Sequence, residues 1–139
     1  MWRFRKTNRS RERGQALVEF LLSAVFLLTT VFAVIEMLVF VYTYVVMAQA
    51  AKAGVRYAIV HGSSSTIPSG PSDYTAVENV VKYYADYPGM TITVSYPDAA
   101  PENHPPNRVR VELVYPFSLL PLGWALPSVR ASAQGRIFF

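Results

Sequence analysis

The sequence predicts an α+β protein in which a long N-terminal helix, transmembrane in its first half and amphipathic beyond, precedes a small C-terminal head. Three observations predict this class: a basic tip, a long apolar stretch without proline, and a second half in which apolar and polar residues alternate. All ten prolines lie at or after Pro68. With 52% hydrophobic residues and no cysteine, the chain is neither mainly disordered nor a disulfide scaffold.

The basic tip comprises residues 1–14, which contain six basic residues and one acidic residue. Since the whole chain has thirteen basic and nine acidic residues, the rest of the chain carries a net charge of −1. Trp2 and Phe4 would also suit a nucleic-acid contact. A positively charged flank that keeps the N-terminus in the cytoplasm explains the cluster more simply, so we expect no nucleic-acid partner.

The apolar stretch is long enough to cross a membrane. Residues 20–35 are sixteen consecutive uncharged residues, and after Glu36 residues 37–51 add fifteen more. A helix of about 20 apolar residues spans a ~30 Å hydrocarbon layer. We therefore predict a helix over residues 15–61 that is transmembrane at about 16–36, with the head outside the cytoplasm. Beyond the membrane, Gln49, Lys52 and Arg56 recur at helical spacing and form one polar, solvated stripe.

Two other interpretations of this stretch are less favoured. A secretory signal peptide would be cut after Ala48-Gln49-Ala50, but the apolar run is about twice the length that such signals have. A buried helix of a soluble protein would not carry sixteen uncharged residues behind a one-sided basic cluster.

The junction between the tip and the apolar run is Arg13-Gly14-Gln15-Ala16-Leu17-Val18-Glu19-Phe20. It resembles the processing site of type IV prepilins, in which a glycine is followed by a glutamate five residues later. The longer segment continues through Ile35-Glu36 and Tyr42-Thr43-Tyr44 to the run from Gln49 to Ala58. From Arg13 to about Gly62 the chain resembles the TadE-like family, minor pilins or pseudopilins of the tight-adherence (Tad, type IVc) pilus system.

The resemblance implies a division of the chain and a set of partners. Residues 1–14 would be a leader that a prepilin peptidase removes after Gly14, leaving Gln15 as the new N-terminus. Glu19 would then pair with the new amine of a neighbouring subunit. Glu36 is a weaker candidate for assembly, because it would equally well sit hydrated at the outer membrane surface. The implied partners are the membrane, other pilin or pseudopilin subunits, the peptidase and the pilus assembly platform.

The head, residues 62–139, is predicted to contain one helix and a three-stranded antiparallel sheet. Thr75 and Glu78 fit a capping box for a helix at about 76–87, with an apolar face of Val77, Val80, Val81 and Tyr84. Strict alternation predicts half-buried strands at 90–96, 108–113 and 129–137. An apolar loop at 116–127 is expected to fold over another element. The row Ala50, Gly54 and Ala58 would let another helix or a sheet approach closely.

No catalytic constellation, cofactor-binding motif or metal-ligand spacing is present in the sequence. His61 and His104 have no second ligand at metal spacing, and Asp98, Glu102 and His104 form only a weak cation cluster. We therefore expect a structural component rather than an enzyme. The alternatives are a permanently membrane-anchored assembly factor and a tethered extracytoplasmic binding module.

Overall fold

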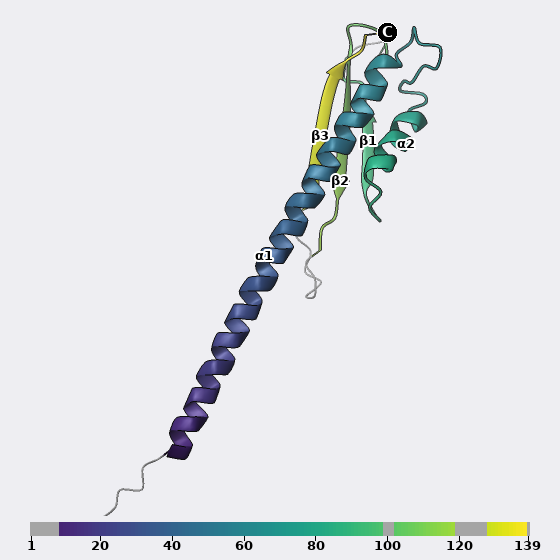
Figure 1. Cartoon of the computed structure of the whole chain (residues 1–139). Coiled ribbons are helices and arrows are strands. Elements are labelled where there is room, and N and C mark those ends of the chain that lie inside the picture. The colour runs from purple at the N-terminus through teal and green to yellow at the C-terminus, as the bar shows by residue number, and fades with distance from the viewer. Residues whose placement is uncertain (1–8, 99–101, 119–127, 139) are drawn as a thin grey trace, which may run out of the picture. The chain divides into compact units, whose positions relative to one another are not determined.

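The structure, a computed structural model, describes residues 9–98, 102–118 and 128–138. For residues 9–13 it describes the backbone only. The chain is an α+β protein with a long apolar N-terminal helix, one short helix and an antiparallel sheet, as predicted (Figure 1). Its elements are α1 (Arg9–Val60), α2 (Thr75–Tyr84), β1 (Thr91–Ser95), β2 (Arg108–Tyr115) and β3 (Val129–Arg136).

Helix α1 already includes residues 9–14 of the tip, so the described helix extends six residues ahead of the predicted boundary at 15. The chain divides into two compact units, Met1–Leu38 and Val39–Phe139. Within the described residues, one helical stretch, Gly14–Val60, is long and apolar enough to cross a membrane, and none of its most apolar window is buried. The exposure contradicts a buried core helix for this stretch and is consistent with a membrane anchor.

The unit Val39–Phe139, which we call the packed unit, is built around the sheet. The strand order is β1-β2-β3, and both neighbouring pairs are antiparallel. Val111 at the centre lies opposite Val94 of β1 and Ala133 of β3. The apolar residues of β2 (Val109, Val111 and Leu113) are completely buried, and their neighbours in the strand are exposed or half-buried. The alternation therefore marks one apolar face, as the sequence predicts.

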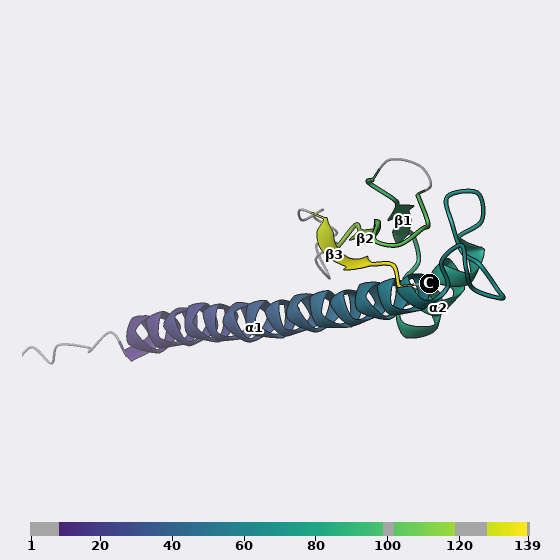
Figure 2. The same ribbon diagram turned by 90° about the horizontal axis from the view of Figure 1, so that it is seen from above.

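This apolar face is covered by the part of α1 beyond Val39 and by α2 (Figures 1 and 2). Two glycines, Gly54 and Gly135, lie where the covering helices come close to their neighbours. A Cβ added at Gly135 of β3 would lie 2.8 Å from Val55 Cγ1 of α1. Small residues on β3 let α1 lie directly on the sheet, so most of the core is formed between the second half of α1 and the strands.

Helix α2 differs from its prediction at the start. The predicted capping box is wrong: Tyr74 occupies the N-cap position, and no side chain there caps the helix. Instead the Thr75 backbone N–H donates to Asp73 Oδ1 at 3.1 Å, so the helix begins one residue earlier than expected. The aspartate before the helix is the residue that satisfies a free N–H group.

The end and the buried face of α2 also differ. The helix stops at Tyr84, three residues before the predicted end, and Ala85 is already extended with φ −148°. Pro88 restricts the residue before it to extended backbone, which contributes to this early exit. Val77 and Val81 are fully buried as predicted, but Tyr84 is 54% exposed instead of lining the core.

The loops beyond β2 and β3 tie the packed unit together. Phe117 is buried and meets Phe40 of α1 edge to face at 5.4 Å between ring centroids, as expected for an apolar loop that folds over a helix. The rest of that predicted loop, 119–127, lies outside the described residues. At the other end, the Phe138 backbone N–H donates to the Ile59 carbonyl at 2.9 Å, so the chain's last described residues satisfy the end of α1.

Candidate functional site

The predicted processing site lies in the first third of α1. Gly14 is helical and exposed, and a Cβ added to it would find no atom within 4 Å. Glycine inside a helix costs about 1 kcal/mol relative to alanine. The helix is therefore less stable at Gly14 than it would be with alanine, and the side of residue 14 faces open space among the described residues.

Glu19 lies one helical turn beyond Gln15. A spacing of four residues places both on one face of α1, about 6 Å apart along the axis. Glu19 is exposed, and no hydrogen bond or ion pair joins it to another described residue. Within a bilayer a carboxylate in that position requires a partner from outside the chain or contact with water at the interface.

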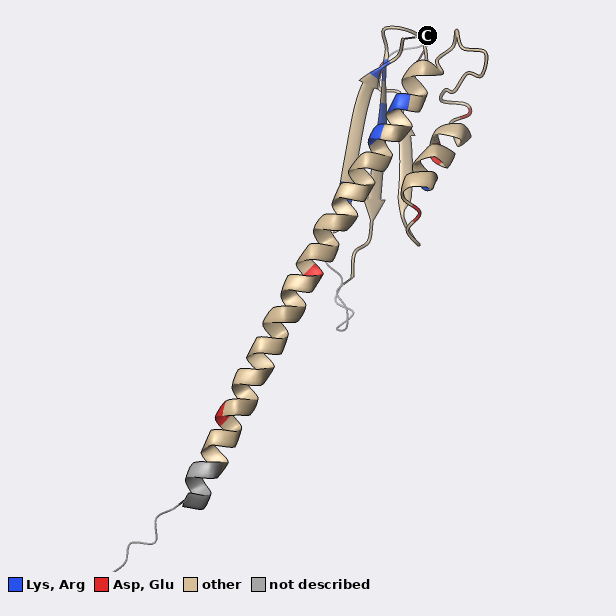
Figure 3. Ribbon diagram, viewed as in Figure 1, with Lys and Arg blue, Asp and Glu red and all other residues tan. Residues whose placement is uncertain are grey.

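Glu36 does not join Glu19. The two carboxylates are seventeen residues apart on one helix, which corresponds to about 25 Å. Glu36 is half-buried, whereas the residues on either side of it are exposed. Figure 3 shows that from Gly14 to Leu38 these two residues are the only charged ones on α1. The two therefore mark opposite ends of an uncharged helical segment.

The row of small residues on α1 contacts this chain's own head. Ala50, Gly54 and Ala58 are all buried. A Cβ added to Gly54 would lie 2.6 Å from Val81 Cγ2 of α2 and 3.6 Å from Val111 Cγ2 of β2. The row therefore serves packing within the subunit, where α2 and the sheet fill the space above it.

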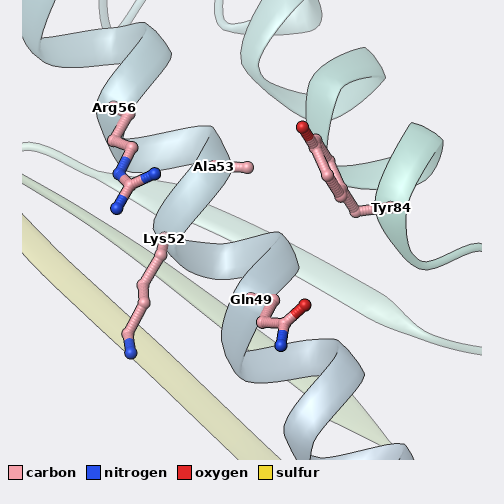
Figure 4. A pocket seen from close by; sticks show the side chains of 5 residues that line it. All are labelled: Gln49, Lys52, Ala53, Arg56 and Tyr84. Atoms are coloured by element: carbon pink, nitrogen blue, oxygen red, sulfur yellow. The ribbon is translucent and has the colours of Figure 1, made fainter.

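A hollow of about 220 Å³ lies between α1 and α2, and sequence reasoning did not foresee it. Figure 4 shows its five lining residues, four from α1 and one from α2: Gln49, Lys52, Ala53, Arg56 and Tyr84. The stripe on α1 was expected from its spacing. The place of Tyr84 in the lining was not expected. Its spacing in the sequence matches the apolar face of α2, and only the packing shows that its ring faces outward.

One ion pair in the packed unit joins the start of β2 to the loop that precedes it. The Arg108 guanidinium contacts the Asp98 carboxylate at 2.7 Å, and the Arg108 backbone N–H donates to the same carboxylate at 2.6 Å. These donors hold the pKa of the Asp98 carboxyl below its ordinary value and raise the pKa of the Arg108 guanidinium. The pair closes the loop between β1 and β2.

The residues considered for metal binding are not brought together. In the ranges that the structure describes, no group of three or more histidine and acidic residues could hold a metal ion. The His61 ring stacks on Tyr57 at 3.9 Å between centroids, and its Nδ1 lies 2.8 Å from the Tyr57 carbonyl oxygen. Asp98 is occupied by Arg108. Burial raises the pKa of the Tyr96 hydroxyl, which lies near Ser69.

Comparison with known proteins identifies one segment of the chain. Residues 14–56 match the family described as TadE-like protein. The matched segment starts at the glycine of the junction and ends at the arginine that lines the hollow, and the resemblance inferred from these residues is confirmed. No curated protein and no solved structure matches the chain.

Proposed function

We propose that this chain, TadE-like over residues 14–56, is a prepilin-like structural and assembly component of a Tad-type type IV pilus, a minor pilin or pseudopilin. The observation that carries the proposal is the uncharged, exposed surface of α1 that begins directly after the Gly14–Glu19 junction, inside the matched segment. A surface of this kind is stable only in lipid or against other helices.

The basic tip and the span determine how the subunit enters the membrane. The six basic residues of the tip hold the N-terminus in the cytoplasm, so that the packed unit lies outside. A prepilin peptidase then cuts after Gly14. Cleavage removes the whole net positive charge of the precursor and creates an amine on Gln15.

The new amine and Glu19 provide the assembly contact. Each group is costly in the membrane without a partner. Pairing Glu19 of one subunit with the Gln15 amine of a neighbour relieves both costs and fixes how far one helix is shifted along the other. Glu36, at the far end of the uncharged segment, is a second and weaker candidate for contact with another subunit or with the assembly platform.

The experiment that tests the proposal is N-terminal sequencing with intact-mass analysis of the chain purified from membranes and from sheared surface filaments. We expect a mature chain that begins at Gln15 in both fractions, with the amine free or methylated. A Gly14→Leu variant should remain uncut and absent from the filaments, while a Ser10→Ala variant in the same tip should be processed normally.

Several outcomes would contradict this function. A chain that begins at Met1 in every fraction favours a permanently anchored assembly factor or a tethered binding module. A chain that begins at Ala51 is a cleaved secretory protein. Loss of ammonia from Gln15, which gives a neutral pyroglutamate, would exclude the charge pair with Glu19.

A further inference from the structure

The seven basic residues outside the tip lie on α1 (Lys52 and Arg56), on α2 (Lys82), on β2 (Arg108 and Arg110) and on β3 (Arg130 and Arg136). Three of the seven form ion pairs within the described residues, all inside the head: Lys82–Glu78, Arg108–Asp98 and Arg110–Glu112. The two on α1, Lys52 and Arg56, are exposed and form no ion pair with any described residue. They lie four residues apart, on one face of the helix. Two like charges held side by side without a counter-charge favour an anionic partner.

The hollow between α1 and α2 gives these two cations a defined setting. Figure 4 shows that the side chains of Lys52 and Arg56 both run towards the N-terminal end of α1, with Gln49 one turn below and the Tyr84 ring across the gap. Ala53 faces that ring and leaves the space open. The walls therefore combine a basic side with an aromatic side.

The chemistry of the lining selects a carboxylate. The Arg56 guanidinium can donate two parallel hydrogen bonds to one carboxylate, and the Lys52 ammonium, the Gln49 amide and the Tyr84 hydroxyl are further donors. Tyrosine and arginine are also among the side chains enriched at protein interfaces. An acidic side chain next to an aromatic one would fill both sides of the hollow.

The chain itself carries such a segment. Asp86 is exposed and forms no ion pair or hydrogen bond with another described residue. It follows Tyr83, which is 86% exposed and meets Tyr84 edge to face at 5.4 Å. Tyr84 lines the hollow, and the next tyrosine, Tyr87, interacts with Thr43 of α1. Asp86 therefore lies between the level of Thr43 and that of Tyr84, on the N-terminal side of the two cations, which is the direction in which their side chains run.

We propose that the hollow is a docking site for a second copy of this chain, whose Asp86 carboxylate binds between Lys52 and Arg56. Copies inserted in one membrane in the same direction lie parallel to each other, so the charged ends of Lys52 and Arg56 in one packed unit can meet Asp86, two residues after α2, in the next. The net charge of −1 outside the tip leaves little general repulsion between packed units. The proposal uses the membrane anchoring described above and does not depend on cleavage at Gly14.

Cross-linking between two differently tagged full-length copies in membranes tests this contact, and the absence of cysteine removes any background. One copy carries Gln49→Cys and the other Tyr83→Cys. A short bis-thiol reagent should join them. Lys52→Glu with Arg56→Glu in the first copy, or Asp86→Lys in the second, should lower the yield at least about fivefold, because like charges then meet in the interface. Combining the two changes should restore the yield.

Matched controls separate this contact from misfolding and from random collision. Arg130→Glu reverses an exposed charge on β3 and should leave the yield unchanged. Ser63→Cys in place of Tyr83→Cys should give no product, because Ser63 lies beyond the end of α1. If combining the changes at Lys52 and Arg56 with Asp86→Lys does not restore the cross-linking yield, Asp86 is not the partner. If neither change alone lowers the yield, the hollow is not the docking site. N-terminal sequencing of the same samples reports processing independently.

Discussion

At Gly54 helix α1 lies close against α2. It is buried, and a Cβ there would lie 2.6 Å from Val81 Cγ2, closer than carbon atoms approach without displacement. The neighbouring methyl groups of Val77 and Val111 would lie at ordinary contact distances, 3.5 and 3.6 Å. The clash would therefore come from one methyl group of α2, and the conformational freedom of glycine is not the reason for its presence in the middle of this helix.

A Gly54→Ala variant should lower the free energy of unfolding of the packed unit by about 1–3 kcal/mol, the usual cost of overpacking a core. Thermal unfolding of the full chain in detergent, followed by near-ultraviolet circular dichroism, measures this. Adding Val81→Ala should recover part of the loss relative to Val81→Ala alone, since it removes the methyl group that clashes. Gly14→Ala is the matched control and should leave the transition in place, because nothing lies within 4 Å of that position. Equal effects of Gly54→Ala and Gly14→Ala would contradict the packing argument.

At the scale of elements, the join between β1 and β2 depends on an ion pair. The two strands are separated by a loop of twelve residues, and Asp98 near its start binds both the side chain and the backbone of Arg108, the first residue of β2. A backbone hydrogen bond and a guanidinium contact on one carboxylate fix where the second strand begins. This pair replaces the tight turn that the sequence lacks there.

The Asp98 pair makes the stability of the packed unit depend on pH. Its pKa is lowered from 3.8 in the folded chain, so its stabilisation is present above pH 3.8 and is lost as the pH falls through the lowered pKa. An Asp98→Asn variant should therefore unfold at a lower temperature than the parent at pH 7, and the difference should shrink towards pH 2. The stability of the Asp98→Asn variant should still depend on pH in part, because hydrogen bonds to Thr75 also lower the pKa of the Asp73 carboxyl.

Melting temperatures at several pH values between 7 and 2 measure this effect. Glu102→Gln is the control, since Glu102 forms no ion pair with a described residue and belongs to the same loop. A constant difference between Asp98→Asn and the parent across this range would mean that the carboxylate charge does not stabilise the loop.

At the scale of the whole molecule, charge is distributed by position along the chain. The +4 of the complete sequence comes entirely from residues 1–14, and the remainder is slightly acidic. A long uncharged stretch of α1 follows, broken only by Glu19 and Glu36 before Lys52. In the proposed function the basic tip orients the chain and is then removed, so the mature subunit offers the new amine of Gln15 and, as its first charged side chain, Glu19.

Glu19→Ala should leave cleavage after Gly14 intact and should reduce incorporation into filaments by roughly a hundredfold, because the partner amine would remain alone in the membrane at a cost of about 3 kcal/mol or more. Immunoblots of sheared filaments and of membranes, normalised to each other, measure the ratio. Glu19→Gln tests whether charge, rather than size, is required and should behave like Glu19→Ala. Val18→Ala, next to it on α1, is the control. Normal incorporation of Glu19→Ala would remove this residue from assembly.

The sequence by itself determined the long helix, the apolar span, the three strands and the TadE-like junction. Each of these depends on a local signal: an unbroken apolar run, strict alternation, or a glycine and a glutamate at a fixed spacing. The buried valines of α2 and the apolar residues of β2 were predictable for the same reason, since periodicity states which side chains share a face.

Only the tertiary structure decided what lies against those faces. The row Ala50, Gly54 and Ala58 was compatible with another helix or a sheet, and the structure fills it with Val81 of α2 and Val111 of β2. Tyr84 has the spacing of a core residue but faces outward, because α2 ends there and Ala85 takes the buried place. The hollow beside Lys52 and Arg56 could not be predicted for the same reason. It forms only because α1 and α2, which are separate in the sequence, lie side by side and the Tyr84 ring faces outward.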